Sequence, residues 1–242
     1  MRGGGATGPG WRVQWLTETG STNDDALLRA RNGEAAGLVL VADHQTAGRG
    51  RLGRSWEAPP GSSLLCTVLL RPPAEDQLST LAMAVAVVEA VEATTGGAVH
   101  PSLKWPNDVL VGDRKLAGIA AVAEGGAVAV GLGLNVDWPP PDRLPAHLAP
   151  LVAALSHHVQ PPPERRAILK SVLAGLDRWC GAPDLLGRYR ALCSTLGQAV
   201  RVDLGARSIE GVAEDVDDDG HLLVDGCAVA AGDVVHLRPA RG

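Results

Sequence analysis

Apolar and polar positions along the chain predict strands in its first half, with one long helix among them. The run 62–70 is apolar at nearly every position, which is typical of a strand buried on both faces. Apolar residues recur at helical spacing between 77 and 95 and predict a helix there. From 102 to 136, short apolar runs separated by tight turns predict a β-meander, in which Gly133 indicates a close approach to the backbone.

The remaining elements complete a two-part chain. Shorter patterns predict strands at 11–18 and 38–42, a helix ending at Arg31, and helices at about 164–180 and 184–194. Beyond residue 196 the pattern changes to short strands at 199–204, 208–215, 221–224, 228–230 and 233–237, which predict a small β-barrel. We therefore expect a flexible tail at 1–10, an α+β domain at 11–195 and a second domain at 196–242.

Composition is ordinary for a soluble globular protein, with 45% hydrophobic and 20% charged residues. The formal net charge of −5 argues against nucleic acid as the main partner. No apolar run is expected to reach the length of a membrane span, because Glu89 and Glu92 interrupt the longest one. The N-terminus lacks the apolar core of a signal peptide, so no membrane association is expected. Four cysteines without metal-ligand spacing fit a reducing cytoplasm.

The most distinctive segment is basic and rich in glycine. It runs over 48–56 and contains Arg49, Arg51 and Arg54, in a chain whose net charge is negative. Glycine lets backbone N–H groups approach an anion, and arginine binds carboxylate or phosphate oxygens. The segment therefore predicts an anion site, with a solvated basic turn as the alternative.

Gly48, Gly50 and Gly53 also match the glycine spacing of a dinucleotide-binding loop. That loop requires a helix directly after its last glycine. Residues 54–61 have turn chemistry instead, so we expect the basic segment to join two strands. A nicotinamide-dependent oxidoreductase is the rival that this match would support, and the missing helix argues against it.

The start of the first helix carries a second polar group. Ser21 or Thr22 can cap this helix, and the following aspartates, Asp24 and Asp25, suit its positive first turn. A helix start also presents free N–H groups to a polar ligand. Capping and ligand binding both remain open for these two residues.

Five segments occur in an order that resembles the biotin–protein ligases. They are Ser21-Thr22-Asn23, Gln45 with 48–56, Lys104–Asp108, Arg114–Ile119 and Gly131–Asn135. The resemblance covers about residues 11 to 138 with high specificity and continues to the C-terminus with low specificity. It implies an α+β fold related to class II tRNA synthetases, with a mixed sheet and flanking helices on one side, followed by an SH3-like barrel.

The resemblance also implies a two-step reaction that uses ATP, biotin and Mg²⁺. Biotin's carboxylate attacks the α-phosphate of ATP, which gives biotinyl-5′-AMP and pyrophosphate. A lysine of a biotin carboxyl carrier domain then attacks this mixed anhydride and releases AMP. Many relatives carry an N-terminal winged helix, but only about ten residues precede the first strand here, so no DNA-binding role is expected. We expect a monomer or weak homodimer.

Roles in the site are carried over from the family residue by residue. Catalysis is implied for Lys115, Arg51 and Arg49, with Lys115 acting on the biotin carboxylate and the α-phosphate. Biotin binding is implied for Ser21, Thr22, Asn23, Gln45, Arg49, Gly50, Arg51 and Lys115. Contact with ATP or the adenylate is implied for Arg54, Lys104, Asn107, Asp108 and Asn135. No metal ligand is assigned, and the divergent segment 139–163 leaves the adenine-stacking residue unassigned.

Alternatives accompany several of these roles. Asn135 is predicted to meet the adenine edge, whereas Asn107 and Asp108 either fix a turn or orient metal and phosphate. Trp56 and Trp105 are predicted to be structural or to form the pocket wall. A lipoate or octanoate ligase on the same fold is the nearest rival function, although such proteins typically lack the arginine–glycine loop. A binding module without chemistry is less compatible with the retained Lys115.

Overall fold

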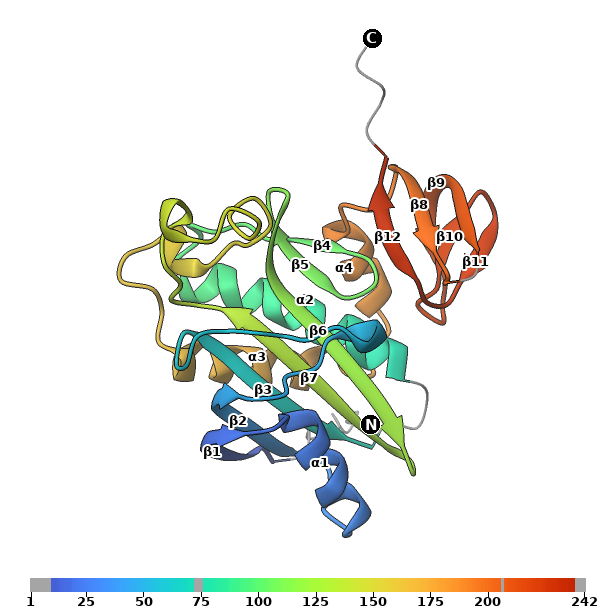
Figure 1. The fold of residues 1–242 in the computed structure, drawn as a ribbon. Coiled ribbons are helices and arrows are strands. Elements are labelled where there is room, and N and C mark those ends of the chain that lie inside the picture. Colours follow the sequence, from blue (N-terminus) through green and yellow to red (C-terminus); the bar gives the residue numbers. More distant parts are fainter. Residues whose placement is uncertain (1–9, 72–75, 206, 238–242) are drawn as a thin grey trace, which may run out of the picture.

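The computed structural model describes residues 10–71, 76–205 and 207–237, and within them two β-sheets and four α-helices form the fold (Figure 1). The predicted tail lies outside the described residues, apart from Gly10. The strands of the first sheet are β1 (Arg12–Thr19), β2 (Leu38–Gln45), β3 (Ser63–Leu70), β4 (Ser102–Lys104), β5 (Asp108–Val111), β6 (Arg114–Glu124) and β7 (Ala127–Asn135). Their order in space is β1-β2-β3-β7-β6-β5-β4.

The pairing of these strands makes the sheet mixed, as predicted. β1 and β2 are parallel, and the other neighbours are antiparallel. The predicted meander is confirmed as β4 to β7. The basic loop joins β2 to β3, and it contains only the short 3₁₀ turn η1 (Arg51–Gly53). The expectation that no helix opens after Gly53 is therefore also confirmed.

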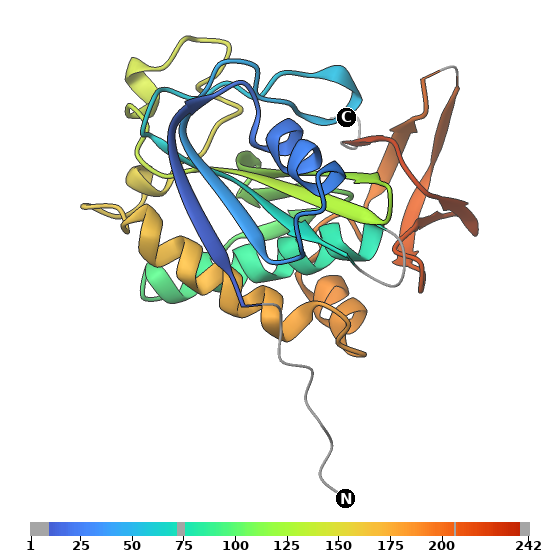
Figure 2. The same ribbon diagram turned by 90° about the horizontal axis from the view of Figure 1, so that it is seen from below.

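Helices cover both faces of the first sheet, which corrects the expectation of helices on one side (Figure 2). They are α1 (Thr22–Arg31), α2 (Asp76–Thr94), α3 (Arg165–Trp179) and α4 (Leu185–Leu192). α1 supplies the crossover that a parallel β1–β2 pair requires, and it packs on one face among apolar residues that include Leu38, Leu40 and Leu69. α2 and α3 lie on the opposite face, over the larger core.

Helix α2 corrects the expectation that no run reaches the length of a membrane span. The window Gln77–Thr94 has a mean hydropathy of 1.3 and is long enough to cross a bilayer, but 67% of it is buried inside the protein. Glu89 is not an exposed interruption, because it accepts hydrogen bonds from Trp179 Nε1 at 3.0 Å and Arg188 Nε at 3.1 Å. α2 is therefore packed as the central core helix of this fold.

The start of α1 also differs from the prediction. Ser21 occupies the N-cap position, but its side chain makes no capping hydrogen bond. Gln45 Oε1, at the end of β2, accepts the Thr22 N–H at 2.7 Å instead. A residue distant in sequence thus replaces the local cap, and the helix begins at Thr22.

The second sheet is antiparallel and has five strands in the order β11-β10-β9-β8-β12. They are β8 (Ala199–Asp203), β9 (Ser208–Val216), β10 (Leu222–Val224), β11 (Cys227–Val229) and β12 (Asp233–His236), close to the predicted strands. Trp105 attaches this sheet to the rest of the chain. Its side chain is 1% exposed, and its Nε1 donates to Gly220 O at 3.0 Å. Trp105 therefore has a structural role, which was one of the two roles predicted for it.

Candidate active site

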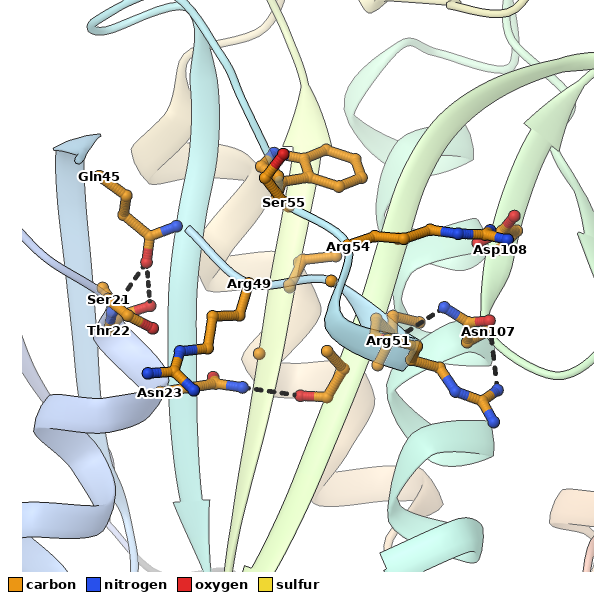
Figure 3. A pocket seen from close by; sticks show the side chains of 18 of the residues that line it. Ser21, Thr22, Asn23, Gln45, Arg49, Arg51, Arg54, Ser55, Asn107 and Asp108 are labelled. Atoms are coloured by element: carbon orange, nitrogen blue, oxygen red, sulfur yellow. Dashed lines mark hydrogen bonds between the residues drawn. The ribbon is translucent and has the colours of Figure 1, made fainter. Parts of the chain in front are cut away.

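One polar cavity of about 120 Å³ brings most of the predicted site residues together (Figure 3). Of these residues, Ser21, Thr22, Asn23, Gln45, Arg49, Gly50, Arg51, Arg54, Asn107, Asp108 and Lys115 line it. Lys104 and Asn135 are not among its lining residues. The cavity lies between the start of α1, the basic loop and the middle of the first sheet, where several cations and uncharged polar groups face one space.

Uncharged polar groups form one side of the cavity, where Figure 3 shows Gln45 beside Ser21 and Thr22. Gln45 Oε1 accepts from both the backbone N–H and the hydroxyl of Thr22, at 2.7 and 2.9 Å. Because the oxygen of the Gln45 amide is engaged in this way, its NH₂ group is directed elsewhere. Ser21 and Thr22 are each 3% exposed, so this polar group is well shielded from bulk water.

Thr67, on β3, belongs to the same group and was missed by sequence reasoning. Its side chain is 0% exposed, and its hydroxyl lies 2.8 Å from Thr22 Oγ1 and 2.5 Å from Asn23 Oδ1. Asn23 Nδ2 in turn donates to Ala120 O at 3.0 Å. The only signal for Thr67 in the sequence was a hydroxyl residue within an apolar strand.

Lys115 is fixed at its backbone and paired at its ammonium. Its N–H donates to Leu151 O at 2.7 Å, and its carbonyl accepts from Ala153 N at 2.9 Å. The Nζ atom lies 2.7 Å from Asp108 Oδ1 and 5.4 Å from the ring centroid of Trp56. The segment around Ala153 therefore anchors the strand that carries this cation, a support that the sequence did not reveal.

Each loop arginine faces a polar partner. Arg49 pairs with Asp24 at 2.9 Å, Arg51 Nη1 donates to Asn107 Oδ1 at 3.3 Å, and Arg54 pairs with Asp233. The loop is closed mainly on itself, because Trp56 N donates to Gly48 O at 2.9 Å and Gly50 N donates to Arg54 O at 2.7 Å. The loop is thus a compact unit with its arginines on the cavity.

Trp56 lies directly over two glycines of the sheet. A β-carbon on Gly133 would be 2.7 Å from Trp56 Nε1, and one on Gly118 would be 2.8 Å from Cζ3 of the same ring. These separations are shorter than any ordinary contact between such atoms. The predicted close approach at Gly133 is therefore confirmed, and the indole is what approaches.

Asn107 has the turn-fixing contacts that were one of its two predicted roles. Its Nδ2 donates to Ile119 O at 2.9 Å, and its carbonyl accepts from Ile119 N at 2.9 Å. These bonds tie the β4–β5 turn to β6. Because Asn107 Oδ1 also faces Arg51, the same residue connects the turn to the basic loop.

Asn135 is buried beside the cavity rather than in its wall. It is 3% exposed, and its Nδ2 donates to Ala153 O at 3.0 Å. Ser63 Oγ lies 3.5 Å from its Oδ1. These contacts give Asn135 a role in holding the segment that anchors Lys115, and its contact with adenine stays a prediction.

The second sheet contributes to the cavity through Gly232 and Asp233, which sequence reasoning did not identify. The hydrogen bond between the side chains of Asp233 and Arg54 lowers the pKa of Asp233 below its ordinary value. This carboxylate is therefore ionised at neutral pH. Burial raises the pKa of the Cys66 thiol to about 12. Cys66 is therefore protonated at neutral pH and is no thiolate nucleophile, although it lines the cavity.

Comparisons with known proteins agree with this geometry. Residues 15–137 match the Biotin/lipoate A/B protein ligase family, and residues 195–237 match the Biotin protein ligase C terminal domain. A biotin--[acetyl-CoA-carboxylase] ligase of Mycobacterium tuberculosis is 40% identical, over 96% of this chain and 91% of that protein. The chain belongs to the biotin/lipoate protein ligase family.

Other members of this ligase family show the same likeness. The biotin--[acetyl-CoA-carboxylase] ligase of Paracoccus denitrificans is 35% identical, over 88% of this chain and 94% of that protein. A biotin protein ligase from Aquifex aeolicus, solved in complex with biotin and ATP, has a TM-score of 0.76 and 28% identity, and the match covers 94% of this chain and 99% of that one. Both sheets of the present structure therefore fall within the biotin protein ligase fold.

Proposed function

We propose that this chain is an ATP-dependent ligase that activates biotin as biotinyl-5′-AMP and transfers it to a lysine of a carrier domain. The observation that carries the proposal is the division of the cavity. In Figure 3, Gln45 and Thr22 lie on one side, and Arg51 and Asp108 lie on the other, where Asp108 holds Lys115. Uncharged donors and acceptors suit the ureido ring of biotin, whereas the cations suit its carboxylate and a phosphate.

The first step joins two anions, so the site must offset their repulsion. Biotin's carboxylate oxygen forms a bond to the α-phosphorus of ATP, and the bond to pyrophosphate breaks. Lys115, with its backbone fixed on β6, stabilises the negative charge that develops on the α-phosphate oxygens. Arg49 and Arg51, on the loop above it, neutralise the two reacting groups and hold the adenylate once it forms.

Lys115, Arg49 and Arg54 can exchange their protein carboxylates for substrate anions when substrates bind. The side chains of Lys115, Arg49 and Arg54 are 37%, 67% and 66% exposed in their pairs with carboxylates. Ion pairs at such exposed positions contribute only about 0–1 kcal/mol each. Replacing a protein carboxylate by a substrate anion therefore costs little, and the carboxylates keep the cations aimed at the cavity until then.

The basic loop is proposed to act as a lid. Its own hydrogen bonds and the Arg49–Ser55 bridge hold its shape, so it can move as a unit about its two ends. Closure would bring Arg51 and Arg54 onto the substrates and exclude water from the mixed anhydride. This protection matters because the anhydride is hydrolysed by any water that reaches it.

The carboxylates of the cavity fit a magnesium ion that arrives with the nucleotide. Asp108 and Asp233 are the acidic residues among the lining, and nucleotide-bound Mg²⁺ is usually held by one or two carboxylates plus the phosphates. Asp108 would hold it here, where the ion would neutralise phosphate charge. The cluster Asp217, Asp219 and His221 has metal-ligand geometry but does not line the cavity.

In the second step, the amine of a carrier lysine attacks the carbonyl carbon of biotinyl-5′-AMP. The new amide bond replaces the anhydride bond, AMP leaves with the electron pair, and the lysine nitrogen loses a proton. The carrier is proposed to be the biotin carboxyl carrier domain of a carboxylase, since the name of the M. tuberculosis relative includes acetyl-CoA-carboxylase. We further propose that the chain acts in the cytoplasm as a monomer or weak homodimer, without nucleic acid or membrane partners.

The finer description of the fold belongs to the same proposal. We assign the first sheet, with its helices on both faces, to the class II tRNA-synthetase-like group, and the second sheet to the SH3-like barrels. The order of the motifs and the five short antiparallel strands support these assignments.

Pyrophosphate release from ATP and Mg²⁺ tests the proposal, with biotin, lipoate or octanoate supplied in turn. We expect release with biotin alone. Release with lipoate or octanoate in its place would favour the rival function on the same fold. No release with any of the three would refute the proposed ligase activity.

A further inference from the structure

Thr67 is a polar residue in an unusual place. It lies in the middle of β3, whose eight residues are all buried, and its own side chain is 0% exposed. A buried hydroxyl without a partner is costly, so such a group is normally hydrogen-bonded. Here the two partners, Thr22 and Asn23, are both residues of the cavity wall.

The protons of this group can be assigned by counting donors. The amide nitrogen of Asn23 donates to Ala120 O, so the other amide atom is Oδ1, and an amide oxygen can only accept. The single proton of Thr67 therefore goes to Asn23 Oδ1, at 2.5 Å. The proton of the Thr22 hydroxyl is then left for Thr67 Oγ1 or for Gln45 Oε1, which lie 2.8 and 2.9 Å away.

This assignment fixes what the neutral side of the cavity offers to a ligand. Both hydroxyl protons are used within the wall, so Thr22 presents lone pairs to the cavity. Gln45 Oε1 is held by Thr22, so the Gln45 NH₂ group presents donors. A cyclic urea has a carbonyl acceptor beside N–H donors, and this wall complements both kinds of group.

We propose that Thr67 is a positioning residue that determines specificity for the ureido ring, although it lies behind the cavity wall. This inference rests on the proposed function. Thr67 orients the carbonyl of Asn23, and because its single proton is used there, Thr22 Oγ1 accepts no proton from it and keeps lone pairs for the cavity. A lipoyl or octanoyl chain has no urea and would gain nothing from this arrangement.

Two matched pairs of variants test the role of the hydroxyl. Thr67→Val keeps the shape of threonine and removes the proton, while Thr67→Ser keeps the hydroxyl. Thr67→Ser and Thr67→Ala both lack the γ-methyl and differ only in the hydroxyl, so this second pair serves if the valine variant does not fold. The Kd for biotin is measured by calorimetry without ATP, and kcat by pyrophosphate release.

An unsatisfied buried group costs about 1–3 kcal/mol, so Thr67→Val should weaken biotin binding about 5- to 150-fold. We expect kcat at saturating biotin to change less than about threefold, because Thr67 contacts no reacting atom. The Kd of Thr67→Ser for biotin should lie within about threefold of the parent value. Thr67→Ala should lose as much affinity for biotin as Thr67→Val.

Thr195 provides the control for loss of a buried hydroxyl. It is also 0% exposed, and its Oγ1 accepts a hydrogen bond from Trp105 N at 3.1 Å, but it does not line the cavity. Thr195→Val should lower Tm without changing the Kd for biotin.

Parental Kd in Thr67→Val, or equal losses in Thr67→Ser and Thr67→Ala, would overturn the inference. A fall in kcat with unchanged Kd would do the same. The proposed function fails separately, if the parent protein itself does not release pyrophosphate with biotin.

Discussion

Gly133 offers a direct test of the contact between Trp56 and the sheet. A β-carbon at this position would lie 2.7 Å from Trp56 Nε1 and 2.8 Å from Cζ2. Carbon atoms pack best at about 3.5–4.0 Å, so the overlap is about 1 Å. β7 cannot retreat, because Gly133 is paired with Leu65 on one side and Gly118 on the other. The indole must therefore move in Gly133→Ala.

The displacement should reduce adenylation more than it reduces stability. Overpacking costs about 1–3 kcal/mol if the indole stays in place, and the loop avoids this cost by moving away from the cavity. If restoring the loop for reaction requires the same ~1–3 kcal/mol, kcat/KM for biotin-dependent pyrophosphate release should fall about 5- to 150-fold. Trp56 sits on a loop and can swing outward, which should keep the change in Tm small. Its movement also takes the ring away from Lys115, at 5.4 Å in the present structure.

A double-mutant cycle isolates the contact. In the Trp56→Ala background no ring remains to be displaced, so adding Gly133→Ala should cause no further loss of activity. Gly187→Ala is the matched control, since a β-carbon at that position has nothing within 4 Å. The reasoning is refuted if Gly133→Ala retains parental activity, or if its penalty is undiminished without the indole.

Three further variants test other contacts. Lys115→Ala should lower adenylation at least ~10²-fold, by loss of one charge-stabilising donor, with unchanged circular dichroism; near-parental rates would contradict its role. Asp233→Asn removes the charge that pairs with Arg54. It should lower the free energy of unfolding at pH 7 by about 0.2–1 kcal/mol, seen as a lower Tm. Because the pKa of Asp233 is lowered on folding, this difference should be present above the ordinary aspartate pKa and vanish as the pH falls through the folded value; a difference that persists in acid would refute the pairing. Trp105→Phe loses the bond to Gly220 O and should cost about 0.5–1.5 kcal/mol in urea unfolding, so unchanged stability would contradict that bond.

The strands and helices of this chain were predictable because their patterns are local. The helical period in 77–95 and the five short runs after 196 require no knowledge of distant contacts, and both appear in the structure close to their predicted bounds. The motif residues of the cavity were predictable by resemblance, since their order along the chain is distinctive. Eleven of the predicted site residues line one cavity as a result.

Contacts between distant segments were not predictable in this way. Gln45 replaces the local cap of α1 from 23 residues away, and Arg54 meets Asp233 across 179 residues. Thr67 looks like one more strand residue until β3 is placed beside α1. The hydrogen bond from the buried amide of Asn135 to the backbone of Ala153 is another such contact, which its motif did not indicate.

The contribution of the second sheet affects when the cavity can exist during synthesis. Gly232 and Asp233 are the last of its lining residues to be translated, about 100 residues after Gly133. At about 5–20 residues per second, the ribosome needs about 5–20 s to cover that distance. A nascent chain therefore carries the basic loop and Lys115 well before Gly232 and Asp233 complete the cavity wall. A chain terminated before Gly220 lacks these two residues and also the Gly220 carbonyl that accepts from Trp105 Nε1. Completion of the cavity wall is thus coupled to near-completion of translation.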